Sequence, residues 1–117
     1  MTDNDNQNAA RIPDDILMAY ISEKAFNTEG VYRMGSYMSA AAIRKNILGQ
    51  NNKTRGVRVT YNEENGYTID IYLIALFGSN IPETAWNVQK SVYNGLKSDY
   101  GVEAEGINIH VQGVHAD

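Results

Sequence analysis

Cysteine is absent and histidine is scarce, and these two facts exclude several kinds of site. A chain without cysteine has no disulfide framework, no thiolate nucleophile and no zinc–thiolate site. The histidines are His110, on an expected solvated strand face, and His115, in the expected C-terminal tail. With Asp70 and Glu103 they make no known metal-ligand pattern, and no nucleophile–base arrangement is recognisable. We therefore expect no catalytic residue, no metal and no cofactor.

Long apolar runs are missing as well. No segment reaches membrane-spanning length, and the polar residues 1–8 lack the apolar core of a signal peptide, so we expect a cytoplasmic protein. Gly30 and Gly35 have the spacing of a phosphate-binding loop, but Ser36 stands where that loop requires lysine. The net charge of −4 argues against a dedicated nucleic-acid binder.

The chain length of 117 residues fits one domain that can bury a core without a metal or a disulfide. Residues 1–10 are rich in Asn and Asp and predict a disordered tail. We expect a single domain over residues 11–114 and a second short tail over residues 115–117.

The longest apolar and β-branched run, Tyr67–Phe77, predicts the central strand. Its alternation assigns these residues to the core side: Tyr67, Ile69, Ile71, Leu73, Ala75 and Phe77. It assigns these to the outward side: Thr68, Asp70, Tyr72, Ile74 and Leu76. After Gly78, the spacing of Asn80 and Glu83 resembles a capping box and predicts a helix over about Pro82–Asp99, with Trp86 and Tyr93 flanking its core stripe.

Four further elements are expected. They are a helix from Asp14 to about Asn27, a short helix over Ser39–Leu48, a strand over Val57–Tyr61 and a last strand over Gly106–Val114. The last strand is reached through a whole helix, so it should run parallel to its neighbour. Val31–Met38 gives no clear prediction.

The strand Val57–Tyr61 and the central strand Tyr67–Phe77 should form a hairpin. A three-residue loop with Gly66 in the left-handed conformation pairs Val57 with Leu73, Val59 with Ile71 and Tyr61 with Ile69, which keeps the apolar side chains on one face. The predicted fold is α+β: a small mixed three-stranded sheet, made of this hairpin and the strand after the crossover helix, with the helices packed on one face.

The outward sheet face is the first candidate partner-binding surface. Tyr72, Ile74 and Leu76 give it an apolar end, and polar side chains surround them: Arg58, Thr60, Asn108, His110 and Gln112. Apolar surface with a polar rim is typical of a protein interface. Alternatively, the second helix or Val31–Met38 folds over this face and covers it.

A basic segment is the second candidate. Between Glu29 and Glu63 there is no acidic residue, whereas six of the ten Lys and Arg residues lie there. We expect five of them to contact anionic lipid or an acidic partner: Arg44, Lys45, Lys53, Arg55 and Arg58. The alternative is a solvated loop in which these side chains face different directions.

Six short motifs in order make the chain resemble a known family. They are Glu29-Gly30-Val31, Gly56-Val57-Arg58-Val59, Ile69-Asp70-Ile71-Tyr72-Leu73, Phe77-Gly78-Ser79-Asn80-Ile81-Pro82-Glu83, Asn87-Val88-Gln89-Lys90-Ser91-Val92 and Ile107-Asn108-Ile109-His110-Val111-Gln112-Gly113-Val114. Together they resemble the alkaline-shock (Gls-type) envelope stress response family of Gram-positive bacteria, over roughly Ile12 to Val114. The resemblance implies a small cytoplasmic α+β protein without known catalysis. It also implies a role in cell-envelope homeostasis, self-association in some members, and a membrane-anchored partner protein.

Two functions remain open at this point. The first is a non-enzymatic scaffold that self-associates and is linked to the membrane through a partner protein. The alternative is a nucleic-acid-binding module that resembles a K-homology-type domain, with the basic segment as its phosphate contact.

Overall fold

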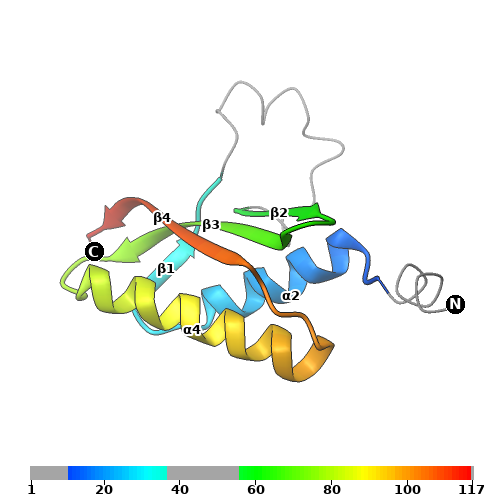
Figure 1. The fold of residues 1–117 in the computed structure, drawn as a ribbon. Helices are drawn as coiled ribbons and strands as arrows, with labels where there is room; N and C mark the ends of the chain where they lie inside the picture. Colours follow the sequence, from blue (N-terminus) through cyan, green and yellow to red (C-terminus); the bar gives the residue numbers. More distant parts are fainter. Residues whose placement is uncertain (1–10, 37–55, 117) are drawn as a thin grey trace, which may run out of the picture.

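The computed structural model describes residues 11–36 and 56–116. Within them the elements follow in the order α2 (Asp14–Phe26), β1 (Val31–Met34), β2 (Val57–Asn62), β3 (Gly66–Leu76), α4 (Ile81–Tyr100) and β4 (Gly106–His115). The predicted α+β class is confirmed (Figure 1). The predicted tail over residues 1–10 and the predicted helix Ser39–Leu48 lie outside the described residues.

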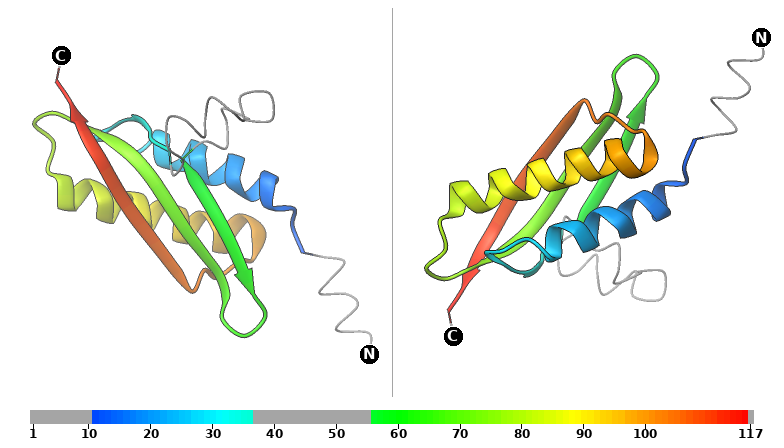
Figure 2. Two further views of the ribbon diagram at one scale, coloured as in Figure 1. Left: turned by 90° about the horizontal axis from the view of Figure 1, so that it is seen from above. Right: turned by 90° about the horizontal axis from the view of Figure 1, so that it is seen from below.

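β3 is the centre of a mixed four-stranded sheet. β1 and β2 pair with it antiparallel, and β4 pairs with it parallel, as expected for a strand reached through a crossover helix. Figure 2 shows β3 between β4 and β2, with α2 and α4 on the same face of the sheet. The sheet therefore has one strand more than predicted, because Val31–Met34 pairs with β3 instead of folding over the outward face.

β1 and β2 lie end to end along one side of β3. β1 pairs with residues 73–75 of β3, and β2 pairs with residues 66–71 of β3. Between them, the Gly35 N–H donates to the Tyr72 carbonyl, and the Tyr72 N–H donates to the Gly56 carbonyl, both at 2.7 Å. The chain therefore leaves this side of the sheet and returns to it at Tyr72.

The hairpin register differs from the prediction. Val57 pairs with Ile71 and Val59 with Ile69, so each partner is displaced by two residues. The loop starts earlier because the Asn62 side-chain oxygen accepts hydrogen bonds from the backbone of the next turn, at Glu64 (2.7 Å) and Asn65 (3.1 Å). A displacement of two residues leaves the faces unchanged, so the predicted inward and outward assignments in β2 hold.

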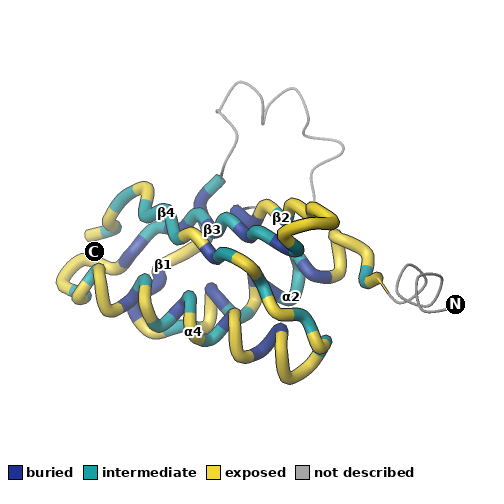
Figure 3. The backbone as a smooth tube through the Cα atoms, viewed as in Figure 1, coloured by how far each residue is buried: buried dark blue, intermediate teal, exposed yellow. Residues whose placement is uncertain are grey.

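The core lies between the sheet and the two helices (Figure 3). Alternation in β3 is confirmed from residue 67 to 75, where the odd-numbered side chains are buried: Tyr67, Ile69, Ile71, Leu73 and Ala75. The helices add Leu17, Ile21 and Ala25 from α2 and Val88, Val92 and Leu96 from α4. Phe77 was expected on this side but is 75% exposed, because β3 ends at Leu76 and the chain turns away beyond the helices.

Local signals set the ends of α4. The Asn80 side chain accepts a hydrogen bond from the Glu83 N–H at 3.0 Å, as the capping-box spacing predicted. Gly101 ends the helix in the left-handed conformation, with φ of 69°. Gly95 faces α2, where a Cβ would lie 2.5 Å from the Tyr20 hydroxyl, so this glycine permits the close approach of the two helices.

Candidate protein-interaction surfaces

The outward face of β3 contains the three apolar residues that the sequence singled out. Tyr72, Ile74 and Leu76 alternate with the buried side chains, and both described helices pack on the opposite face. Tyr72 and Ile74 are half-buried and Leu76 is 37% exposed. The predicted orientation of these side chains is therefore confirmed, whereas their role in binding a partner remains a prediction.

A polar cluster stands beside Tyr72 on the same face. The Asp70 carboxylate lies 2.9 Å from His110 Nε2 and accepts a hydrogen bond from the Asn108 side chain at 3.2 Å. The His110 ring stacks on the Tyr72 ring, with 4.3 Å between centroids and 11° between planes. No Ser or Thr hydroxyl among the described residues hydrogen-bonds to His110. The cluster thus fixes the imidazole over Tyr72 without forming a nucleophile–base arrangement.

Gln112 joins β4 to the point where the chain leaves β1. Its side-chain oxygen accepts from the Ser36 N–H at 2.9 Å, and its side-chain nitrogen donates to the Ser36 carbonyl at 2.7 Å. A Cβ at Gly35 would meet the Gln112 oxygen at 2.1 Å, so a side chain there would displace the Gln112 amide from Ser36. Gln112 also marks the register shift in β4, where one extra residue enters the strand.

Of the five basic residues predicted to contact a partner, Arg58 lies in the described part of the chain. Arg58 is exposed on β2 and lies opposite Asp70 in the strand register. The other four predicted residues, Arg44, Lys45, Lys53 and Arg55, lie outside the described residues. A contact with anionic lipid or an acidic partner therefore stays a prediction.

Three exposed apolar side chains lie at the end of the sheet where β3 and β4 finish: Leu76, Phe77 and Val114, which is 49% exposed. The Phe77 N–H donates to the His115 carbonyl at 2.8 Å and ties the β3–α4 turn to β4. The His115 ring stacks on Tyr32 with 3.8 Å between centroids, so a half-exposed ring pair borders the cluster. We call Leu76, Phe77 and Val114 the sheet-end cluster.

A third surface was missed by the sequence analysis. β4 is an edge strand, and α4 lies beside it. Between them is a shallow hollow of about 380 Å³, lined by Pro82, Ala85, Trp86, Gln89, Ile107, Asn108 and Ile109. Trp86 is 57% exposed and Tyr93 36% exposed. Both had been assigned to the flank of the core; their spacing of two helical turns was the signal that they share a side of α4.

None of the described helices is both long and apolar enough to cross a membrane. No group of three or more His, Asp or Glu side chains in residues 11–36 and 56–116 is arranged to hold a metal ion.

Comparison with known proteins gives the family. Residues 2–116 match the pattern of the alkaline shock protein 23 family, which is described as having a cell envelope-related function. The chain belongs to this family. The match covers all described elements, and it confirms the resemblance drawn from the six motifs.

Relatives of this family member come from Gram-positive bacteria. The uncharacterized protein YloU of Bacillus subtilis is 31% identical over 103 residues, which are 88% of this chain and 85% of YloU. The uncharacterized protein Spy1614 of Streptococcus pyogenes is 27% identical over 103 residues, covering 88% of this chain and 84% of that protein. No solved structure matches the chain significantly. Neither the family description nor these names assign a reaction.

Proposed function

We propose that this chain is a non-enzymatic interaction protein of the cell envelope, which self-associates and is linked to the membrane through a partner protein. The cell envelope-related function of its family supports the setting. The observation that carries the proposal is the sheet-end cluster, where Leu76, Phe77 and Val114 expose apolar surface at one end of the domain. Apolar side chains that gather on a surface are typical of protein contacts.

The proposed contact with the partner protein uses apolar side chains. The sheet-end cluster, together with Tyr72 and Ile74 on the adjoining outward face, supplies apolar contacts to the partner protein. Tyr72, Ile74 and Leu76 follow one another on the outward face of β3, so a partner helix or strand could contact all three at the same time. No Lys, Arg, Asp or Glu occurs among them, and desolvating this surface therefore requires no burial of unpaired charge.

Self-association is tested by light scattering of the purified chain over a concentration series. The expected result is a mass above that of the 13.0 kDa monomer, increasing with concentration. A strict monomer at high micromolar concentration would remove self-association from the proposal.

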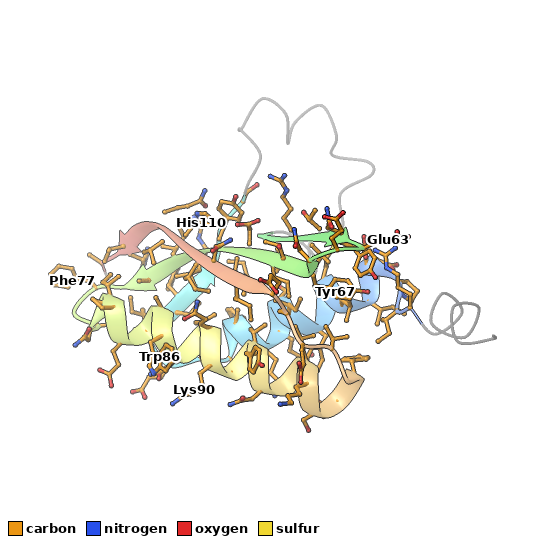
Figure 4. All side chains as sticks on the ribbon, in the orientation of Figure 1. Glu63, Tyr67, Phe77, Trp86, Lys90 and His110 are labelled. Carbon is orange, nitrogen blue, oxygen red and sulfur yellow. The ribbon has the colours of Figure 1, made fainter. Side chains whose placement is uncertain are left out.

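The membrane-linked partner is tested by photo-crosslinking in the source cells. Phe77 is replaced by photoreactive benzoylphenylalanine, and Glu63, at the opposite end of the domain (Figure 4), is replaced in the same way as the control. We expect a crosslinked adduct with an integral membrane protein from position 77 and none from position 63. Equal crosslinking from both positions, or none from position 77, contradicts a partner at the sheet-end cluster.

The nucleic-acid alternative rested on helices lying on one side of the predicted sheet and on the basic segment. Of the six basic residues in that segment, Arg33 and Arg58 belong to the described residues.

A further inference from the structure

β4 lacks the charged residues that protect most edge strands. It runs from Gly106 to His115 without Lys, Arg, Asp, Glu or Pro. Edge strands usually carry such residues because their unpaired backbone groups would otherwise bind another strand. Within the described residues, the backbone of residues 108–114 makes no further backbone hydrogen bond besides its ladder with β3. The segment Gly106–Val111 precedes the register shift.

One hydrogen bond shows which backbone groups point outward from β4. The Gln89 side chain donates to the Ile107 carbonyl at 2.6 Å, from α4 beside the strand. Backbone groups alternate in direction along a strand, so those of Ile109 and Val111 point to the same outer side as those of Ile107. Gln89 occupies one position that a neighbouring strand would use, and the next two positions have no such partner in the described chain.

Exposed aromatic side chains stand next to this edge. Trp86 projects from α4 into solvent (Figure 4), and its exposed fraction of 57% is high for the largest apolar side chain of the domain. Tyr93 lies two turns further along the same side of α4. Trp and Tyr are the residues most enriched at the energetic centres of protein interfaces. Apolar surface and unpaired backbone therefore lie side by side.

We propose that the β4 edges of two copies of this chain pair antiparallel about a two-fold axis, which joins their sheets and brings the Trp86 sides of the two α4 helices together. This inference rests on the self-association in the proposed function and names its surface. It assigns the β4 edge to a second copy and leaves the sheet-end cluster to the partner protein.

The composition of β4 favours a second copy over a different strand. Two-fold pairing brings the same short segment of the two copies together, so charges of one sign within it would face one another across the axis. Gly106–Val111 contains none. An axis centred on Ile109 pairs Ile107 with Val111 of the partner copy, and Asn108 with His110 of the partner copy. Apolar side chains thus meet on the helix side and polar ones on the outward side.

Interface size supports the participation of α4. Stable interfaces bury roughly 1,200–2,000 Å² in total, which is more than a short strand edge supplies. The hollow of about 380 Å³ between α4 and β4 provides a concave surface at the same place, with Trp86 at its rim. Side chains from α4 of the second copy would cover it, and Gln89 would have to release the Ile107 carbonyl or share it.

Two surface variants and a matched control test the proposal by analytical ultracentrifugation. Asn108→Lys adds a charge to the exposed strand face and can pair with Asp70, so it should fold. Trp86→Ser removes the exposed aromatic ring. Phe77→Ser, the control, removes a still more exposed ring outside the proposed interface. Both surface variants should raise the dimer dissociation constant at least about tenfold, whereas the control should change it less than about threefold.

The outcomes separate the two proposals. If the wild-type chain forms dimers and neither Asn108→Lys nor Trp86→Ser weakens them, the β4 edge is not the interface, and self-association stands. If Phe77→Ser weakens the dimer and the other two do not, the interface lies at the sheet-end cluster and the inference is overturned. If the wild-type chain stays monomeric, self-association itself is wrong. Circular dichroism of each variant verifies folding.

Discussion

Single glycines decide whether the chain can close around Tyr72. Gly56 has φ of +85°, and a Cβ there would lie 2.9 Å from both the Gly35 and the Tyr72 carbonyl oxygens. Gly66 has nearly the same φ, +84°, but nothing lies within 4 Å of the added atom. The two positions therefore differ in steric contact and share the backbone requirement.

Gly56→Ala should consequently cost more stability than Gly66→Ala. Gly66→Ala should lower the free energy of unfolding by about 1–2 kcal/mol, the cost of a left-handed non-glycine residue. Gly56→Ala adds a clash with backbone atoms that cannot rotate away, and it should cost at least about 1 kcal/mol more. Urea denaturation of the two variants measures the difference. Equal losses would show that β1 and β2 can separate at Tyr72 without cost.

Tyr20 is the residue with the clearest pH dependence. Burial, followed by its hydrogen bond to the Asp99 carboxylate, raises the pKa of Tyr20 from 10.0 to about 12. A phenol is neutral below its pKa, so the folded chain keeps the proton at pH values where the unfolded chain has lost it. The stability that this group contributes is complete below pH 10.0 and is lost as the pH rises toward 12.

Tyr20→Phe should therefore be less sensitive to alkaline pH than the wild-type chain. The variant lacks the bond to Asp99 and should be less stable near neutral pH, by about 1 kcal/mol. The difference between the two proteins should shrink between about pH 10 and about pH 12, because only the wild-type chain has this titrating group. Chemical denaturation at several pH values measures the difference. A gap that stays constant or widens would show that the folded chain does not hold this proton.

Helices and strands were predictable where their signals are local. The capped start of α4 follows from Asn80 and Glu83, and the two faces of β3 follow from alternation. β1 was missed because it has only four residues and its pairing partners, around Leu73 and Ala75, are distant in the sequence. The hairpin register was wrong because it depends on the Asn62 side chain in the turn, which residue alternation does not describe.

The cap of α4 can be tested as an element of its own. Asn80→Ala should lower the free energy of unfolding by about 1 kcal/mol, because the Glu83 N–H loses its acceptor. Asn94→Ala, at an exposed position inside the same helix, is the control and should be neutral or slightly stabilising. Thermal unfolding compares the two. If both substitutions have the same effect, the cap does not stabilise α4.

For the whole molecule, the sequence predicted the outward face and missed the edge. Tyr72, Ile74 and Leu76 were assigned correctly because a face depends only on alternation. Predicting the contact between Asp70 and His110 would have required the register between β3 and β4. Predicting that β4 is an edge strand would have required the strand order. Both depend on contacts between distant segments, which a single sequence does not specify.

As proposed, the molecule has two separate surfaces for two partners. The sheet-end cluster lies where β3 and β4 finish, and the β4 edge with Trp86 runs along the side of the domain. A protein that binds a membrane-linked partner at one surface and its own copy at the other would concentrate several partners at one place. Separate surfaces also mean that a variant of one should leave the other intact.

Amide hydrogen exchange at Ile109 and Val111 tests the central claim most directly, because these N–H groups point outward from β4 and would be paired only in the dimer. The exchange rates are measured by nuclear magnetic resonance at concentrations well below and well above the dissociation constant. We predict that both amides exchange at least about tenfold more slowly at the high concentration, whereas the Val88 amide in α4 shows a much smaller change. Rates at Ile109 and Val111 that do not depend on concentration, in a chain that light scattering shows to be dimeric, would contradict pairing along β4.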